Sequence, residues 1–239
     1  MNCRVMGIVN VTPDSFSDGG RYFSPEEAVR RARNIIAEGA DIVDLGGEST
    51  RPGAKPISWQ EEWARIEPVL RDLMPCAVPV SVDTYHPETA ERAVDAGATI
   101  VNCVYSEPIP DMQRLLADRP VELVMPATAE PSDSAAWASR IYLDPMIGFG
   151  TTREEDLARL RALPELAKRG RVLVGASRKR IVKKLVCGIG GAKGDGPVGK
   201  NVGGSVAIAA WCALNGASVV RVHDVRETVS AFRVLAALA

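Results

Sequence analysis

Short apolar runs alternate with helix-start signals about eight times along this chain. The runs that predict strands are Arg4–Val9, Asp41–Leu45, Pro79–Asp83, Thr99–Val104, Val121–Met125, Ile141–Asp144, Val172–Gly175 and Val219–Val222. Ser24, Ser58, Thr152 and Asp224 are each followed three residues later by glutamate, a pattern typical of a helix N-terminus. Strand, loop and helix in regular alternation predict a (β/α)8 barrel, or TIM barrel. A doubly wound open sheet is the alternative on the pattern alone.

Glycines end the predicted helices. Gly39, Gly97, Gly170 and Gly216 each lie between a helix-forming segment and the next apolar run. Glycine at this place can take the left-handed conformation that terminates a helix. We therefore expect all four to supply that conformation.

Two segments depart from the repeat. Pro126–Arg140 leaves room for one short helix around Ser132–Ser139, so we expect the fifth helix to be truncated or missing. Gly188–Gly204 contains eight glycines in seventeen residues, which predicts a flexible loop between an apolar helix ending near Val186 and a helix over Ser205–Leu214. Its glycines do not follow the G-x-x-x-x-G-K-[ST] pattern of a P-loop.

Composition narrows the class of protein. A chain of 239 residues with 46% hydrophobic content suits one domain of barrel size over residues 1–239. With 29 basic and 30 acidic side chains, nothing predicts nucleic acid or a membrane as partner. The five cysteines form no C-x-x-C pair, which favours reduced thiols over disulfides or zinc. We see no signal peptide and no membrane-length apolar run, and so expect a cytoplasmic protein.

Polar residues follow the predicted strands where each strand ends. They are Asn10, Glu48–Arg51, Asp83, Asn102, Asp144, Lys179, Arg221 and His223, with Met125 as the last residue of the fifth strand. In a TIM barrel these positions surround one mouth, where active sites form. Each residue taken singly could cap a helix or tie a turn. Burying all of them at one mouth would cost free energy unless a ligand or a hydrogen-bond network satisfied them, so together they predict a ligand-binding or active site.

These residues form two groups that differ in charge. Arg221 and His223 alternate along one strand and therefore share a face, which suits a phosphate or diphosphate. Asp83, Asn102 and Asp144 suit a neutral heterocycle that offers several N–H donors. The polar loop after Asn10 is rich in oxygen groups that suit Mg²⁺ and phosphate chemistry. The residues predict a ligand with an amide-like ring at one end and a phosphate group at the other.

Six segments resemble, in order, the signatures of the dihydropteroate synthases, a family of pterin-binding TIM-barrel enzymes. They are Met6–Gly20, Asp44–Gly53, Ser81–Thr84, Leu143–Pro145 with Gly148–Gly150, Ser177–Lys179 and Arg221–Asp224. The first two are long and highly specific. The similarity runs from about residue 4 to the C-terminus and is weakest between residues 103 and 140.

Enzymes of this family join 6-hydroxymethyl-7,8-dihydropterin diphosphate to p-aminobenzoate and release diphosphate. The resemblance implies pterin binding by Asp83, Asn102, Met125, Asp144, Phe149, Gly175 and Lys179. It implies diphosphate binding by Asn10, Arg221 and His223, with Mg²⁺ at Asn10. It implies an arylamine slot of Thr50, Pro52, Phe149, Ser177 and Lys179. Catalytic roles would fall to Thr50, Arg51, Asp83, Asp144 and Lys179, under loops 11–20 and 49–54 that close over the site.

The chain departs from the family pattern at four places. Cys103 stands where many members have Asp, Pro126 where His is common, and Thr151 where Lys is usual. The long fifth helix is largely missing between Pro126 and Arg140. None of these changes removes an expected pterin or diphosphate ligand.

Three functions are compatible with the pterin pocket. A dihydropteroate synthase explains both loop signatures. A non-catalytic pterin-binding homologue would keep the pocket without needing Asn10, Thr12, Asp14 and Arg51. A methyltransferase acting on reduced methyl-pterins would share the barrel but leaves the Asn-Val-Thr-Pro-Asp-Ser loop unexplained. Family members are commonly homodimers, and the apolar helices predicted at the C-terminal end would allow a homodimer here.

Overall fold

A computed structural model describes residues 2–12, 24–49, 54–129, 137, 139–186 and 201–238. Eight parallel strands close into a barrel in chain order. They are β1 (Arg4–Asn10), β2 (Ile42–Gly46), β3 (Val80–Asp83), β4 (Ile100–Asn102), β5 (Glu122–Pro126), β6 (Ile141–Asp144), β7 (Arg171–Val174) and β8 (Val219–Val222). The predicted TIM barrel is confirmed, and ring closure between β1 and β8 excludes the open sheet.

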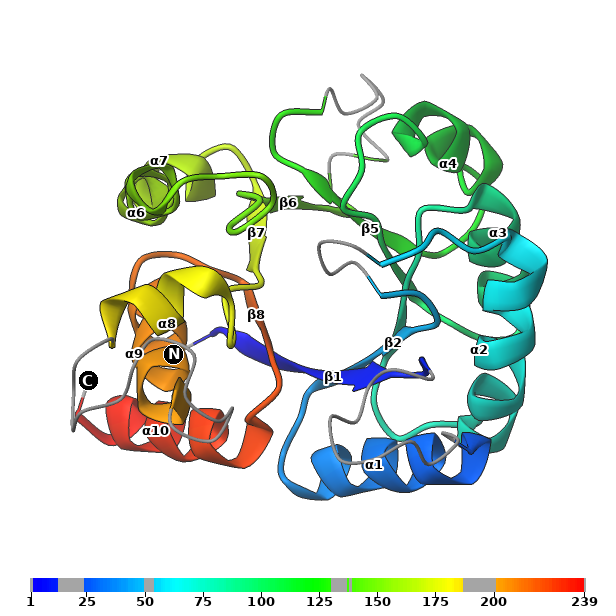
Figure 1. The fold of residues 1–239 in the computed structure, drawn as a ribbon, viewed down its shortest axis with the longest axis horizontal. Helices are drawn as coiled ribbons and strands as arrows, with labels where there is room; N and C mark the ends of the chain where they lie inside the picture. The colour runs from blue at the N-terminus through cyan, green and yellow to red at the C-terminus, as the bar shows by residue number, and fades with distance from the viewer. Residues whose placement is uncertain are drawn as a thin grey trace.

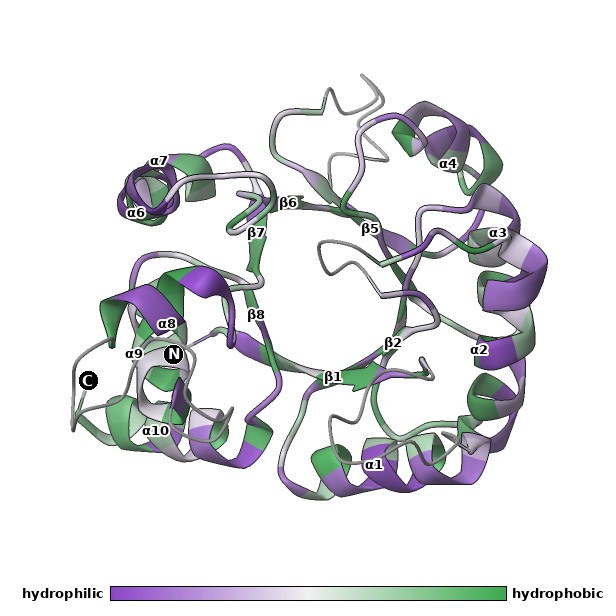
Figure 2. Cartoon of the chain, viewed as in Figure 1, coloured by the Kyte–Doolittle hydropathy of each residue, from purple (hydrophilic) through white to green (hydrophobic). Residues whose placement is uncertain are grey.

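The described helices lie outside the ring of strands (Figure 1). They are α1 (Pro25–Ala37), α2 (Trp59–Leu73), α3 (Pro87–Asp95), α4 (Ile109–Leu115), α6 (Arg153–Arg161), α7 (Leu163–Ala167), α8 (Arg180–Leu185), α9 (Val202–Leu214) and α10 (Val225–Leu238). None of these helices is long and apolar enough to cross a bilayer. Figure 2 shows that the strands are largely hydrophobic, whereas the helices mix hydrophobic and hydrophilic residues.

The predicted helix starts are present. The Ser24 and Ser58 hydroxyls accept backbone N–H bonds three residues later, at 3.4 and 3.3 Å. Thr152 completes a reciprocal capping box with Glu155, and α10 begins directly after Asp224. These bonds satisfy N–H groups that the first turn of a helix leaves without partners.

Three of the four glycine predictions are confirmed. Gly39, Gly97 and Gly216 have φ values of +100°, +105° and +97°, the left-handed region that glycine tolerates. Gly170 was wrongly predicted, because it is not among the positive-φ residues. The short helix α7 ends at Ala167, and turn residues 168–170 lead into β7 without a left-handed residue.

One apolar layer fills the middle of the barrel. It consists of Met6, Ile42, Ile100, Val124, Tyr142, Leu173 and Val219, contributed by seven different strands. Other clusters pack between the strands and the helices. The closed middle layer makes this a packed barrel, and polar side chains lie above and below it.

The two irregular segments lie mainly outside the described residues. Of the predicted short helix over 132–139, the structure describes residues 137 and 139. Trp137 is 3% exposed and packs in the cluster on the outer face of β5 and β6. Most of the predicted loop over 188–204 is also outside the described part, but its last residues belong to α9, which starts three residues earlier than Ser205.

Candidate active site

Arg221 reaches from β8 across the barrel to two carboxylates. Its Nε donates to Asp44 Oδ2 at 2.6 Å, and an Nη donates to Asp83 Oδ2 at 2.5 Å. Asp44 lies on β2 with 0% of its side chain exposed, and Asp83 ends β3. Burial by itself would lower the pKa of Arg221, but the two carboxylates outweigh it and raise that pKa. We refer to this end of the barrel, where the strands finish, as the carboxyl mouth.

The same arrangement makes Asp83 easier to protonate. Burial raises the pKa of Asp83 to about 7, with the charge of Asp44 acting in the same direction and that of Arg221 opposing it. Two carboxylates therefore compete for one guanidinium at neutral pH. Asp44 was not among the predicted site residues. Its position at the start of the signature Asp44–Gly53 was visible in the sequence, but its partner was not.

Asn102 is the least satisfied polar residue of the carboxyl mouth. It pairs in register with Asp83 across β3 and β4 and is 1% exposed. Neither its Oδ1 nor its Nδ2 has a hydrogen-bond partner among the described residues, and Asp44 Oδ1 is also unpartnered. A buried amide without partners costs free energy unless a ligand supplies a donor and an acceptor.

Asp144 and Lys179 form the side of the mouth opposite Asp83. Asp144 Oδ1 accepts the backbone N–H of Met146 at 2.6 Å, and burial raises its pKa. Lys179 Nζ donates to Ile147 O at 2.7 Å and lies 4.1 Å from the centre of the Phe149 ring. Burial lowers the pKa of Lys179 to about 8, although the charge of Asp144 opposes that shift.

His223 and Ser177 extend the site beside Arg221. Ser177 Oγ lies 3.2 Å from His223 Nδ1 and also accepts the backbone N–H of His223 at 3.2 Å. A side chain at Gly175 would place its Cβ 3.9 Å from Arg221 and 4.0 Å from Lys179 Nζ. The missing side chain at Gly175 therefore leaves room between the two cations.

Asn10 reaches the same mouth from β1. A Cβ at Gly46 would lie 3.9 Å from both Asn10 Oδ1 and Asp83 Oδ2, so both oxygens face this glycine. An amide oxygen is a hard donor of the kind that Mg²⁺ accepts. No group of three or more His, Cys, Asp or Glu side chains in the described part of the chain could hold a metal by itself.

Met125 packs on a different side of its strand from the polar residues of the carboxyl mouth. It is fully buried in the cluster outside the barrel, and Gln113 Nε2 of α4 lies 4.0 Å from its Sδ. Its neighbour Val124 occupies the inward position, in the middle layer. Successive residues of a strand point to opposite faces, so Met125 lies on the outward side of β5, and its contact with the pterin stays a prediction.

Thr50, Arg51 and Pro52 lie outside the described residues, but the start of their loop is anchored. Glu48 Oε1 accepts the hydroxyl of Tyr85 at 2.9 Å. Below it, Glu62 is 0% exposed and accepts the hydroxyl of Thr84 at 2.6 Å. Burial raises the pKa of Glu62 to about 7.

Arg178 connects two loops of the mouth and was not predicted as part of the site. It has a φ of 58°, and its Nε donates to Asp224 Oδ2 at 3.0 Å. Ser205 of α9 accepts the backbone N–H of Arg178 at 3.1 Å. The residue between Ser177 and Lys179 is thereby tied to the residue after His223.

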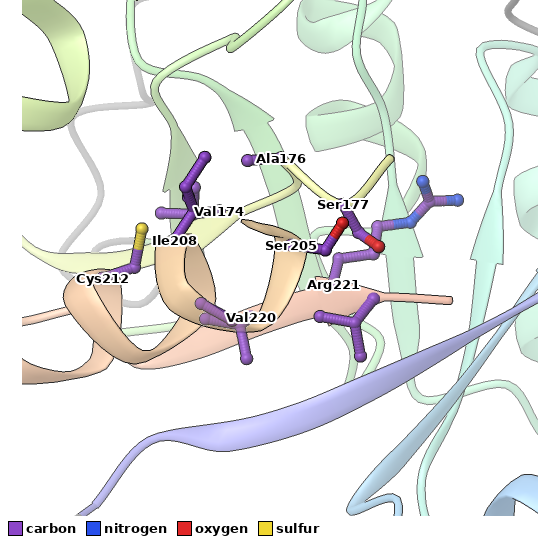
Figure 3. Close-up of a pocket in the computed structure, with 10 residues that line it drawn as sticks. Val174, Ala176, Ser177, Ser205, Ile208, Cys212, Val220 and Arg221 are labelled. Carbon is purple, nitrogen blue, oxygen red and sulfur yellow. The ribbon is translucent and has the colours of Figure 1, made fainter. Parts of the chain in front are cut away.

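A small pocket lies behind this site, between α9 and strands β7 and β8 (Figure 3). Val174, Val220, Ile208 and Cys212 make most of it apolar. Figure 3 shows the Arg221 guanidinium extending away from this pocket. The pocket is thus a packing gap between layers and not the mouth where the polar residues meet.

The family model for pterin-binding enzymes matches residues 6–137 and 134–223. The dihydropteroate synthase of Mycobacterium leprae is 40% identical over 98% of this chain and 93% of its own length. The chain belongs to the dihydropteroate synthase family. The Xanthomonas albilineans dihydropteroate synthase with 4-aminobenzoic acid has a TM-score of 0.88 and 39% identity, covering 99% of this chain and 93% of that one. Its complex with 7,8-dihydropteroate has a TM-score of 0.82 and 36% identity, covering 99% and 94%.

These matches cover nearly the whole chain, including residues that lie outside the described strands and helices. Dihydropteroate synthases that resemble this chain over nearly their whole length share its closed barrel. The shortened segment between β5 and β6 therefore does not remove the chain from the family.

Proposed function

We propose that this chain is a dihydropteroate synthase that condenses 6-hydroxymethyl-7,8-dihydropterin diphosphate with p-aminobenzoate. The observation that carries the proposal is Asn102, whose two buried amide atoms have no partner within the described structure. A pterin ring offers an adjacent donor and acceptor that match an amide. The related Xanthomonas albilineans structures contain 4-aminobenzoic acid and 7,8-dihydropteroate.

The pterin would lie across the carboxyl mouth. Asp83, Asn102 and Asp144 would bind its N–H and C=O groups, and Lys179 would donate to its ring acceptors. Phe149 and Gly175 would line the pocket. Asp83 and Asp144 both have raised pKa values because of burial, so N–H donors from the ring would favour their ionised forms.

Diphosphate would leave towards Arg221 and His223. Breaking the bond from the pterin methylene to the diphosphate oxygen gives the oxygen the electron pair and leaves a cation delocalised into the ring. Ionised Asp83 and Asp144 would oppose that positive charge, while Arg221 and His223 would receive the negative one. Diphosphate must compete with Asp44 and Asp83 for Arg221, so Asp83 is freed for the pterin as the anion takes its place.

Asn10 would hold Mg²⁺ together with diphosphate oxygens and water, since Mg²⁺ prefers oxygen ligands and commonly binds through substrate phosphates. When bound, Mg²⁺ would supply positive charge that neutralises the leaving group. The amine of p-aminobenzoate then forms a bond to the methylene carbon and loses a proton to water. Such an attack needs no strong base.

The arylamine would enter a slot formed by Thr50, Pro52, Phe149, Ser177 and the stem of Lys179. Arg51 would act when its loop closes over both substrates. Sulfonamides resemble the arylamine, so we expect them to compete for this slot. Trp211 and Leu214 of α9 and Val234 and Leu238 of α10 are 47–80% exposed, and this apolar surface would suit a homodimer.

A turnover assay tests the proposed function. Purified protein is given Mg²⁺, dihydropterin diphosphate and radiolabelled p-aminobenzoate, and labelled dihydropteroate is measured. We expect product that disappears when EDTA removes the metal. Binding of the pterin diphosphate without any product would contradict the proposal and identify a non-catalytic pterin-binding homologue.

A further inference from the structure

Asp156 is a buried charge on a helix that should bury only apolar residues. It is 0% exposed and lies four residues before Leu160, the other buried residue of α6. Residues spaced by four share one helix face, so a carboxylate occupies a position that suits a core side chain. A carboxyl group buried at such a place costs free energy unless hydrogen bonds or an opposite charge compensate for it.

Asp156 holds the turn that follows β6. Its Oδ1 accepts the backbone N–H of Gly148 at 2.8 Å and the hydroxyl of Thr151 at 2.5 Å. Thr151 is 5% exposed, and its Oγ1 also accepts the Gly148 N–H at 3.1 Å. Gly148 and Gly150 have φ values of +78° and +67°, so this left-handed turn depends on such bonds to keep one conformation.

The turn contacts Lys179 at two places and packs closely against its stem at a third. Ile147 O accepts from Lys179 Nζ at 2.7 Å, and the Phe149 ring centre lies 4.1 Å from the same nitrogen. A Cβ at Gly148 would come within 3.0 Å of Lys179 Cδ, so backbone and lysine stem are closely packed. A shift of this turn would therefore move the ammonium.

We propose that Asp156 and Thr151 are positioning residues for the reaction, acting through the turn Ile147–Gly150 on Lys179. The inference rests on the proposed function, in which Lys179 contacts both substrates. Thr151 replaces the lysine that is usual in the family at this place, and its hydroxyl provides one of the two bonds to Asp156.

A double-mutant cycle tests whether Asp156 acts through Lys179. The dissociation constant of pteroate is measured by calorimetry for the wild type, Asp156→Ala, Lys179→Ala and the double variant. We expect Asp156→Ala to weaken binding about tenfold in the wild type but less than about twofold when Lys179 is absent, because residues of one network are not additive. Additive losses would overturn the proposal. Glu154→Gln removes an exposed acidic charge from the same helix and is the matched control.

A second pair of variants keeps the test valid if Asp156→Ala fails to fold. Thr151→Val removes the hydroxyl at nearly constant volume, whereas Thr151→Ser keeps it. We expect the valine variant to bind pteroate several-fold more weakly and the serine variant to bind as the wild type does. Equal binding by both variants, with a lower unfolding midpoint for valine, would show a purely structural brace and overturn the proposal.

The pH dependence of pteroate binding provides a readout that a structural role would not change. The negative charges of Asp144, Asp83 and Asp156 raise the pKa of Lys179, and the charge of Arg221 lowers it. In Asp156→Asn, which keeps an acceptor oxygen for the turn, we expect the alkaline loss of binding to begin at lower pH. Because this variant keeps an acceptor for the turn, a loss of affinity at neutral pH as large as that of Asp156→Ala would overturn the inference. If the wild type binds pteroate but makes no dihydropteroate, the proposed function fails separately.

Discussion

The two ends of the barrel both contain arginines and carboxylates, but their polar side chains differ in hydrogen-bond partners and in exposure to water. At the end where the strands begin, which we name the amino mouth, Tyr142 receives hydrogen bonds from Arg4 and Arg171 and donates to Glu122 at 3.2 Å. The Arg171 guanidinium also stacks 4.0 Å from the Tyr142 ring centre. At the carboxyl mouth, the side chain of Asn102 has no such partners within the part of the chain that the structure describes.

Exposure separates the two networks further. The side chains of Arg4, Glu122 and Arg171 are 37%, 29% and 33% exposed, so water reaches part of this network. Nε and one Nη of Arg171 are themselves buried and have no hydrogen-bond partner among the described residues. Asp44 and Arg221 at the other mouth are 0% and 17% exposed. A buried polar group that neither water nor protein satisfies needs an explanation, and a ligand that binds there is one. The comparison favours the carboxyl mouth as the place where a substrate would bind, because Asp44 and Arg221 are less exposed than the charged residues of the amino mouth and Asn102 lacks partners there for both amide atoms.

Matched substitutions of one arginine from each mouth should give the largest contrast. Arg221→Met leaves Asp44 and Asp83 without their cation, so we expect a loss of about 3–5 kcal/mol in unfolding free energy. Its turnover should fall about a hundred- to a thousandfold. Arg171→Met should cost at most about 1 kcal/mol and leave turnover nearly unchanged. Urea unfolding and initial rates measure both, and similar losses of turnover at the two mouths would contradict the comparison.

The buried Glu62 behind the carboxyl mouth should make stability depend on pH. Because its pKa is raised from 4.5 to about 7, the folded state binds the proton more tightly, and stability falls as pH rises from about 4.5 to about 7. Glu62→Gln should match the wild type near pH 4 and exceed it by about 3 kcal/mol above pH 8. Urea unfolding across this range is the measurement, and a constant difference would refute the assignment.

Asn102 should show opposite effects on stability and binding. Asn102→Leu replaces two unpartnered polar atoms with apolar ones of similar volume, so unfolding free energy should rise by about 1 kcal/mol. Pterin affinity should fall about ten- to a hundredfold, since the ring loses its amide partner. Calorimetry with 6-hydroxymethylpterin and thermal unfolding check both expectations. A variant that binds as the wild type does would place the pterin elsewhere.

Much of the fold was predictable because its signals are local. Serine and threonine caps act over three residues, and glycine stops act at single positions, so Ser24, Thr152 and Gly97 could be interpreted without a structure. Gly170 shows the limit of such signals, since the turn that it follows needs no left-handed residue. The strand-end positions of Asp83, Asn102 and Asp144 were predictable for the same reason.

By itself, the sequence determined the order of strands and helices, the family signatures and the residue types at the carboxyl mouth. The tertiary structure decided which of those residues meet. Arg221 and Asp44 are 177 residues apart and lie within 2.6 Å only because the barrel closes. The side chain of Met125 packs on the outer face of β5. Asp156 of α6 is buried where it accepts the backbone N–H of Gly148, in the turn after β6. Both positions also depend on the tertiary structure. The direction of each side chain depends on the strand register and on the helix packed against it, and neither is a local property of the chain.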